Sequence, residues 1–392
     1  MTAQRPPASP AVIAAAGIAA VGCSFGMARY GYGLLLVSIR GSYHLSTGAL
    51  GLIAAGGYAS YLIASTAAVA LVPRLGGRAV VVAGGACATV GMASAGLTRT
   101  SAGLCASVLV AGASAGLVFP PFSDIVATSV EPAQRGRTLA AISSGTGWGV
   151  AIAAPLAIAL GDDWRPAWLI WAGLAAVITL ACAWMLPSGG GASAVQLPAL
   201  RPSWFVCPRS GPLLGGALLI GLGASVFWTF AVELLQSSGG LQQGASRGFL
   251  MLVGLASVAG TLAADLTRRV GPRRAFVLSA GLMAASLGLL AVWPGSVPAA
   301  LVAGIGFGAA YNAVVALQTL WSAEVFAGRP SAGLAAVMTM LGIGQLIGPS
   351  LAGAAAGAVG LRGAFLGAAT VVALSATLLP RRERLPAALL NR

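Results

Sequence analysis

Charged residues are scarce in this sequence. Only 8% of its 392 residues are Asp, Glu, Lys or Arg, whereas 58% are hydrophobic. A soluble domain carries roughly 25% charged residues. A chain with so few charges cannot cover the surface of a water-soluble protein of this size, so most of its surface must face lipid. The composition therefore excludes a soluble multi-domain protein and predicts an all-α membrane protein.

Lysine is missing altogether, because arginine accounts for all 22 basic residues. Without lysine the chain has neither the cation of a Walker A loop nor the amine of a Schiff base, so we do not expect it to hydrolyse ATP. The formal net charge of +14 does not indicate a nucleic-acid partner. Its arginines lie in short tracts between apolar runs and do not form one basic face.

Histidine and cysteine are too few and too scattered for a metal site. His44 is the sole histidine, and the five cysteines are spread along the chain, four of them singly inside apolar runs. No ligand cluster or disulfide framework follows from such spacing. The sequence Gly112-Ala113-Ser114-Ala115-Gly116 matches a hydrolase pattern, but it lies in an apolar run with no intramembrane histidine as a base. We expect no enzymatic activity, no metal and no cofactor.

Long apolar runs fill most of the chain, and a spanning helix needs about 20 such residues. We predict twelve transmembrane helices, at 11–37, 47–71, 78–97, 102–126, 138–160, 167–187, 212–236, 246–266, 275–293, 298–321, 331–357 and 363–380.

The distribution of arginine predicts the orientation of these spans. With the N-terminus in the cytoplasm, the outer segments hold only a minority of the arginines, while Arg29 lies within a span. This bias agrees with the positive-inside rule. We expect both termini to be cytoplasmic, in the cytoplasmic (inner) membrane of a bacterium. The outer arginines are Arg40, Arg99, Arg165, Arg247 and Arg362.

The two halves of the chain resemble each other at an offset of about 197 residues. Residues 163–168, 139–142 and 76–79 are matched by residues 360–365, 334–337 and 272–275. Between the halves, residues 188–211 are rich in Pro, Gly and Ser, as a linker would be. We therefore predict two pseudo-symmetric six-helix bundles, 1–187 and 212–392, joined by a cytoplasmic linker. Duplicated halves are typical of alternating-access transporters.

The segment Asp265-Leu266-Thr267-Arg268-Arg269-Val270-Gly271-Pro272-Arg273-Arg274 resembles the Asp-and-basic loop motif of the major facilitator superfamily. Its counterpart, Pro73-Arg74-Leu75-Gly76-Gly77-Arg78, keeps the glycine and the arginines but has Pro73 where the family usually has Asp. Arg135-Gly136-Arg137 and residues 348–353 are also similar to family patterns. The resemblance covers nearly the whole chain and implies gating roles for Asp265, Arg74, Arg78, Arg135, Arg137 and Arg273.

Two further patterns refine this resemblance. Residues 26–32, Gly-Met-Ala-Arg-Tyr-Gly-Tyr, resemble the start of the bacterial YbfB/YjiJ-like subgroup. The signatures of the drug/proton antiporter branch are missing, because Val108 stands at the place of that branch's arginine and Pro155 lacks the surrounding glycines. The resemblance therefore does not favour drug export.

Arg29 is the sharpest candidate for a functional residue, because it lies roughly 9 Å from the middle of the first span at 1.5 Å per residue. A charge at such a depth costs at least about 2–3 kcal/mol unless it is paired or hydrated. One interpretation is an anion anchor in a cavity, since guanidinium offers a bidentate fork to carboxylate or phosphate. The other is a structural pair with a carboxylate or with helix carbonyls.

Two acidic residues inside spans are candidates for proton coupling. Glu233 lies near the outer end of the seventh span, and Asp124 lies near the inner end of the fourth. A carboxyl group can exchange protons as its surroundings change between dry and hydrated. Alternatively, Glu233 is an interfacial carboxylate already near water, and Asp124 makes a gate contact with Arg135 or Arg137.

Other polar and aromatic side chains fall in spans that resemble the cavity-lining helices of the family. For each of them, helix packing is an alternative to ligand contact. Asn312 and Gln345 stand out, because an amide in apolar surroundings needs a hydrogen-bond partner. With Arg29, the predicted substrate-binding set is Tyr30, Tyr58, Trp148, Trp228, Tyr311, Asn312 and Gln345.

These observations predict a monomeric secondary active transporter that moves a small solute by alternating access. We expect the solute to be an organic anion and the transport to be proton-linked, with membrane lipids as the surrounding partner. One alternative is an exporter of hydrophobic or cationic compounds, with Glu233 and the aromatic residues as its site. The other is a non-transporting membrane sensor or scaffold, for which the sequence offers no sizeable soluble domain.

Overall fold

A computed structural model of the chain describes residues 9–187, 210–259, 263–326 and 330–379, with the side chains of 263–265 and 330–332 left out. Every regular element in these residues is a helix. Ten of the helices are long and apolar enough to cross a membrane. The prediction of an all-α membrane protein is confirmed.

The first part of the chain begins with one long bent helix, Pro10–Tyr43. It consists of α1 (Pro10–Val21), the π-helical segment η1 (Gly22–Arg29) and α2 (Gly31–Tyr43). Five more helices follow: α3 (Thr47–Leu75), α4 (Gly77–Leu97), α5 (Ser101–Ser129), α6 (Pro132–Leu160) and α7 (Trp164–Met185).

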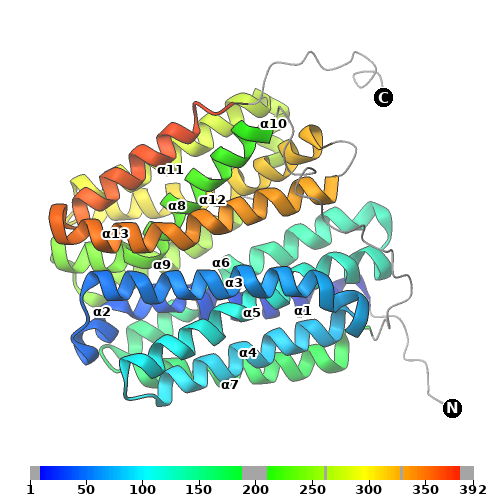
Figure 1. Cartoon of the computed structure of the whole chain (residues 1–392), viewed down its shortest axis with the longest axis horizontal. Coiled ribbons are helices and arrows are strands. Elements are labelled where there is room, and N and C mark those ends of the chain that lie inside the picture. The colour runs from blue at the N-terminus through cyan, green and yellow to red at the C-terminus, as the bar shows by residue number, and fades with distance from the viewer. Residues whose placement is uncertain (1–8, 188–209, 260–262, 327–329, 380–392) are drawn as a thin grey trace.

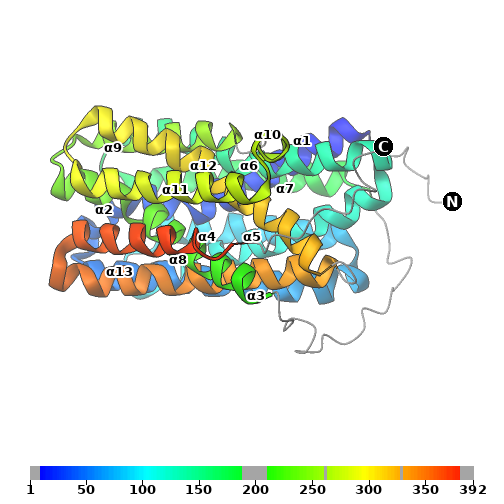
Figure 2. The same cartoon turned by 90° about the horizontal axis from the view of Figure 1, so that it is seen from above.

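The second part begins with α8 (Ser210–Glu233), which continues into a second π-helical segment, η3 (Leu234–Ser238). It is followed by α9 (Gln243–Ser257), α10 (Ala263–Val270), α11 (Pro272–Val292), α12 (Val297–Val325) and α13 (Pro330–Ser375). At Gly360 the backbone of α13 leaves the helical region, with φ 71° and ψ 168°. The two arms of α13, up to 359 and from 361 onward, lie side by side in Figures 1 and 2.

The helix boundaries have local chemical causes. Hydroxyl side chains cap the helices at three turns: Ser46 accepts from the backbone N–H of Ala49 at 3.2 Å, and Thr100 and Ser296 form equivalent caps. Such caps satisfy backbone donors that lipid cannot. Most predicted spans agree with the observed helices to within a few residues.

The helices run roughly parallel to the long axis of the molecule, so their turns gather at two ends (Figure 1). We call the end with the α2–α3 turn at His44 the His44 end, and the opposite end, with the α3–α4 turn at Gly76, the Gly76 end. The largest contacts between helices from the two parts of the chain are those of α2 with α8, α3 with α13, and α6 with α9.

Glycine allows α6 and α9 to cross at very short range. A Cβ atom on Gly254 would lie 2.6 Å from the carbonyl oxygen of Gly147 and 3.0 Å from the backbone nitrogen of Ala151. Neither backbone atom can move away without distorting its helix. In lipid, helix association depends on such close packing, since there is no hydrophobic force between the helices. This crossing therefore requires glycine at 254.

We predict that Gly254→Ala destabilises the purified protein by about 1–3 kcal/mol, because the added methyl group overpacks the crossing. Gly248→Ala on the same helix is the matched control. A Cβ atom there would meet nothing within 4 Å, and alanine favours a helix by about 0.5–1 kcal/mol over glycine. Thermal unfolding in detergent measures both variants. Equal unfolding temperatures for the two would contradict the proposed constraint.

Candidate functional site

Arg29 ends the π-helical segment η1, in the middle of the long first helix. A π-helical turn is rare, and such turns frequently mark functional sites in helices. Here α6 presses against the segment, since a Cβ atom on Gly26 would lie 2.5 Å from the main chain of Gly149. At the end of this segment, Arg29 lies beside Tyr58 and Tyr61 of α3.

Four aromatic rings surround the Arg29 guanidinium. Its Cζ atom lies 3.9 Å from the ring centroid of Tyr61 and 4.7 Å from that of Tyr58. Phe25 and Tyr30 lie further out, at 5.3 and 5.6 Å. Ring faces attract a cation electrostatically, but they carry no formal negative charge. The guanidinium is therefore stabilised without being neutralised.

Arg29 makes its hydrogen bond across the structure to the second part of the chain. One terminal nitrogen donates to Oε1 of Gln345 at 2.6 Å, and the Gln345 amide donates to the Tyr311 hydroxyl at 3.0 Å. The Nε atom of Arg29 is buried and has no acceptor. This chain of bonds unites three residues of the predicted set, which lie on η1, α13 and α12.

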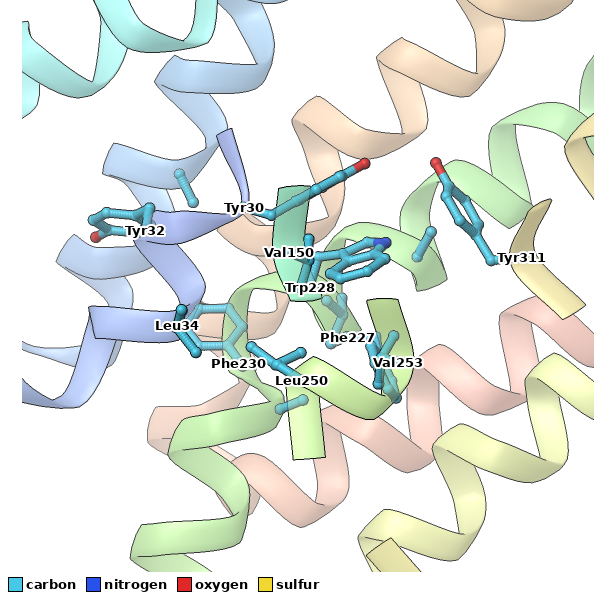
Figure 3. Close-up of a cluster of buried hydrophobic side chains, with 14 of the residues drawn as sticks. Tyr30, Tyr32, Leu34, Val150, Phe227, Trp228, Phe230, Leu250, Val253 and Tyr311 are labelled. Atoms are coloured by element: carbon cyan, nitrogen blue, oxygen red, sulfur yellow. The ribbon is translucent and has the colours of Figure 1, made fainter. Parts of the chain in front are cut away.

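A small cavity adjoins the Arg29 cluster, with an empty volume of about 340 Å³ including space open to solvent. Trp228 stacks on Tyr30 at a centroid distance of 4.3 Å, and its Nε1 is buried without an acceptor. Figure 3 shows the hydroxyls of Tyr30 and Tyr311 pointing toward one another beside the indole. The lining residues are Ala28, Arg29, Tyr30, Tyr32, Gly33, Ala54, Gly57, Tyr58, Val108, Gly112, Trp228 and Thr229.

Two residues of the predicted substrate-binding set, Trp148 and Asn312, do not line the cavity. Trp148 is 43% exposed and shares a face of α6 with Ile152, which is 58% exposed; it is not a lining residue of the cavity. Asn312 donates from its amide to the backbone carbonyl of Ser257 at 2.9 Å. It thus joins α12 to α9, as a packing role would require.

Glu233 is buried, with a relative exposure of 1%, and forms an ion pair with Arg40 of α2. Thr47 also donates to its Oε1, at 3.3 Å, while Oε2 has no partner. Arg40, which the sequence places in an outer segment, lies in the last turn of α2. The sequence contained no signal for this pair, since the two residues are far apart in the chain.

Arg247 is a buried residue that the sequence analysis assigned to an outer segment. Its relative exposure is 1%. It donates to the carbonyl oxygens of Ala157 and Gly161 at 2.5 Å each, and to the hydroxyl of Ser38 at 2.8 Å. These carbonyls end α6, where the helix dipole favours a cation. Arg247 therefore fastens α9 to α6 and α2 at the His44 end.

The predicted gating residues lie at the Gly76 end, and most are exposed. Asp124 is exposed, and in the described part of the chain it forms no ion pair with Arg135 or Arg137. The expected contact of Asp124 with Arg135 or Arg137 is therefore not made there. Arg135 instead donates to the carbonyl of Val130 at 2.9 Å. The side chain of Asp265 is outside the described residues. Arg74, Arg137 and Arg273 are exposed, and Arg78 is half-buried.

Comparison with known families identifies the class of protein. The helical fold is that of a multi-pass membrane protein. A family model described as "Uncharacterised MFS-type transporter YbfB" matches residues 21–380. The chain therefore belongs to this family of the major facilitator superfamily, as its motifs indicated. No curated protein matches the sequence.

Solved structures of transporters share the fold. The nucleoside transporter NupG superposes with a TM-score of 0.77 at 14% identity, over 94% of this chain and 97% of that one. Its D323A mutant gives a TM-score of 0.78 at 14% identity, covering 93% and 98%. A bacterial homologue of the human lysosomal transporter Spinster, in an inward-facing and unoccupied conformation, gives 0.77 at 14%, covering 94% and 96%. At this identity the likeness concerns the fold alone.

We predict that Arg247→Gln loosens the His44 end, because glutamine cannot replace three charge-assisted bonds worth about 1.5–3 kcal/mol each. Leu34, which Figure 3 shows beside Phe230 and Leu250, is 2% exposed and serves as the reporter. In a cysteine-free background, Leu34→Cys should react with a membrane-impermeant thiol reagent at least several-fold faster when Arg247 is replaced.

The matched control is Arg99→Gln, which removes an exposed arginine at the same end. It should leave the labelling rate at Leu34→Cys unchanged. If both replacements accelerate labelling equally, the buried bonds of Arg247 do not hold this end closed.

Proposed function

We propose that the protein is a secondary active transporter that moves a small organic anion by alternating access. The observation that carries this proposal is Arg29: a guanidinium in the middle of the bundle, bonded to an amide and surrounded by aromatic rings. A cation inside a membrane bundle without an acidic partner is costly. A substrate carboxylate arriving in the cavity would supply the missing charge.

The proposed architecture is twelve transmembrane helices in two pseudo-symmetric bundles, 1–187 and 212–392, with 188–211 as the linker. The break at Gly360 divides α13 into two spans, and α9 with α10 supplies another. The turn before α4 and the turn before α11 have nearly the same backbone conformation, which supports the pseudo-symmetry of the two bundles. Gly76 has φ 84° and ψ 151°, and Gly271 has φ 83° and ψ 156°. The packing of α3 on α5 also corresponds to that of α9 on α12.

The bonds between the proposed bundles suggest how access alternates. Arg29–Gln345 joins them at the centre, while Arg40–Glu233 and the bonds of Arg247 join them at the His44 end. If the first bundle rocks against the second, these bonds break together and the cavity opens at that end. The described state is then closed toward the outside, with both termini on the cytoplasmic side of a bacterial inner membrane.

Glu233 is the point at which we place proton coupling. Its ion pair with Arg40 exists only while the carboxylate is charged, so protonation weakens the closed His44 end and favours the open one. Asp124 is exposed and unpaired in the described part of the chain, which makes it the weaker candidate. We therefore propose Glu233 as the proton-linked residue and a monomer as the working unit.

The alternatives have less support. An exporter of cationic compounds would need an acid in its site, but Glu233 is not among the residues that line the cavity. A sensor or scaffold would have no use for an uncompensated guanidinium in the bundle. Family membership also favours transport.

We predict that Arg29→Gln abolishes anion uptake by proteoliposomes while the protein still folds and elutes as a single species. Arg165→Gln is the matched control, because Arg165 also lies on aromatic rings, 4.5 Å from Trp164 and 5.7 Å from Tyr43, but remote from the cavity. It should keep most of its activity. Absence of flux above empty vesicles for every anion tested with the unmodified protein would refute the anion proposal.

We further predict that Glu233→Gln uncouples transport from protons, because glutamine is permanently neutral. Uptake driven by an imposed pH gradient should fall to background, while exchange of labelled for unlabelled substrate continues. Glu131→Gln, which alters an exposed acid at the Gly76 end, should leave both activities intact. Gradient-driven uptake that persists in Glu233→Gln would assign proton coupling to another residue.

A further inference from the structure

We infer that the anion taken by this site is a small aromatic monocarboxylate, a planar ring carrying a single carboxylate. This inference rests on the proposed function and names the substrate class of the same site. It is carried by the juxtaposition of one uncompensated guanidinium, a second buried donor without an acceptor, and flat aromatic walls around a small cavity.

The charge of the site fits a monoanion. Arg29 is the only charged residue among those that line the cavity, and within the described residues it has no acidic partner. One carboxylate therefore neutralises the site. A dicarboxylate or a phosphate dianion would leave a negative charge buried without a partner, which is costly. A cation would face repulsion from Arg29.

The unsatisfied hydrogen-bonding groups of the site are donors. Nε of Arg29 and Nε1 of Trp228 are both buried without an acceptor, and both residues line the cavity. A carboxylate only accepts hydrogen bonds and offers about four lone-pair positions. A carboxylate can therefore accept from both of these donors. A neutral amide is less suitable, because it brings donors of its own. The amide oxygen of Gln345 now occupies one of the positions that a carboxylate oxygen would take.

The walls of the site fit a flat apolar body. Tyr30 and Trp228 stack with an interplanar angle of 20°, and Tyr58 lines the same cavity. Aromatic rings prefer to meet other rings in stacked or edge-to-face arrangements. Gly33, Gly57 and Gly112 line the remaining wall without side chains. The cavity is small and lies between closely packed helices, so a single ring suits it better than a large ligand.

The test is a thermal-shift and binding titration of the purified, unmodified protein at pH 7. Benzoate is the probe, benzamide is its neutral isostere, and benzylamine is a cation of similar size. Acetate is a carboxylate without a ring, phthalate is a dianion, and uridine is a planar neutral compound. We expect benzoate to raise the unfolding temperature and to bind about tenfold or more tightly than benzamide. Acetate, phthalate, benzylamine and uridine should give little or no shift.

Variants assign the interaction to its residues. Arg29→Gln should remove the preference for benzoate over benzamide, and Trp228→Phe, which keeps a ring but lacks the N–H, should weaken benzoate several-fold. Arg165→Gln should bind benzoate as the unmodified protein does. Since the ligand series is measured on the unmodified protein, a variant that fails to fold does not spoil the test.

The outcomes separate this inference from the proposed function. If acetate binds and is transported while benzoate is not, the aromatic assignment is wrong; if phthalate does so, the monoanion assignment is wrong. In both cases the anion transporter stands. If benzylamine or uridine binds and no carboxylate does, both proposals fall. Preferential benzoate binding together with saturable uptake of labelled benzoate supports both.

Discussion

The central constraint on this structure is a positive charge that must exist inside a membrane. A guanidinium cannot lose its proton, and lipid offers it neither water nor a counterion. The chain meets this constraint with four ring faces, one amide and a cavity. Because these groups come from both parts of the chain, the helices that carry them must meet at Arg29.

A second set of charges acts at the His44 end, and its chemistry differs from that of the centre. There Glu233 forms an ion pair with Arg40, and Arg247 donates hydrogen bonds to carbonyl oxygens at the end of α6. Ion pairs and carbonyl contacts of this kind can break and re-form when water enters. The centre thus contains a charge without a protein counterion, whereas this end contains charges that already have partners. In the proposed mechanism, the centre is the ligand site and the His44 end is the closure between helices.

Small residues make both arrangements possible. Gly147 and Gly254 allow backbone contact between α6 and α9, and the main chain of Trp228 packs directly on Gly33. Without such contacts the polar side chains of one part could not reach the other. In the proposed mechanism, the helices rock at these crossings, because no interlocking side chains hold them in one position.

The sequence by itself determined the membrane environment, most helix boundaries and the position of Arg29 inside a helix bundle. These follow from composition, apolar length and the cost of charge in lipid, all of which are local properties. The break between residues 357 and 363 was also predicted and matches Gly360.

Only the tertiary structure decided which side chains contact each other. Arg40 and Arg247 gave the sequence signal of ordinary outer residues, yet both join distant helices. From the sequence, Trp148 and Asn312 were candidates for the binding site just as Tyr58 and Gln345 were. In the structure, Trp148 is exposed and Asn312 bonds to a backbone carbonyl of α9. Apolar helices show too little periodicity to tell which face meets protein and which meets lipid, so these partnerships emerge only when the helices pack.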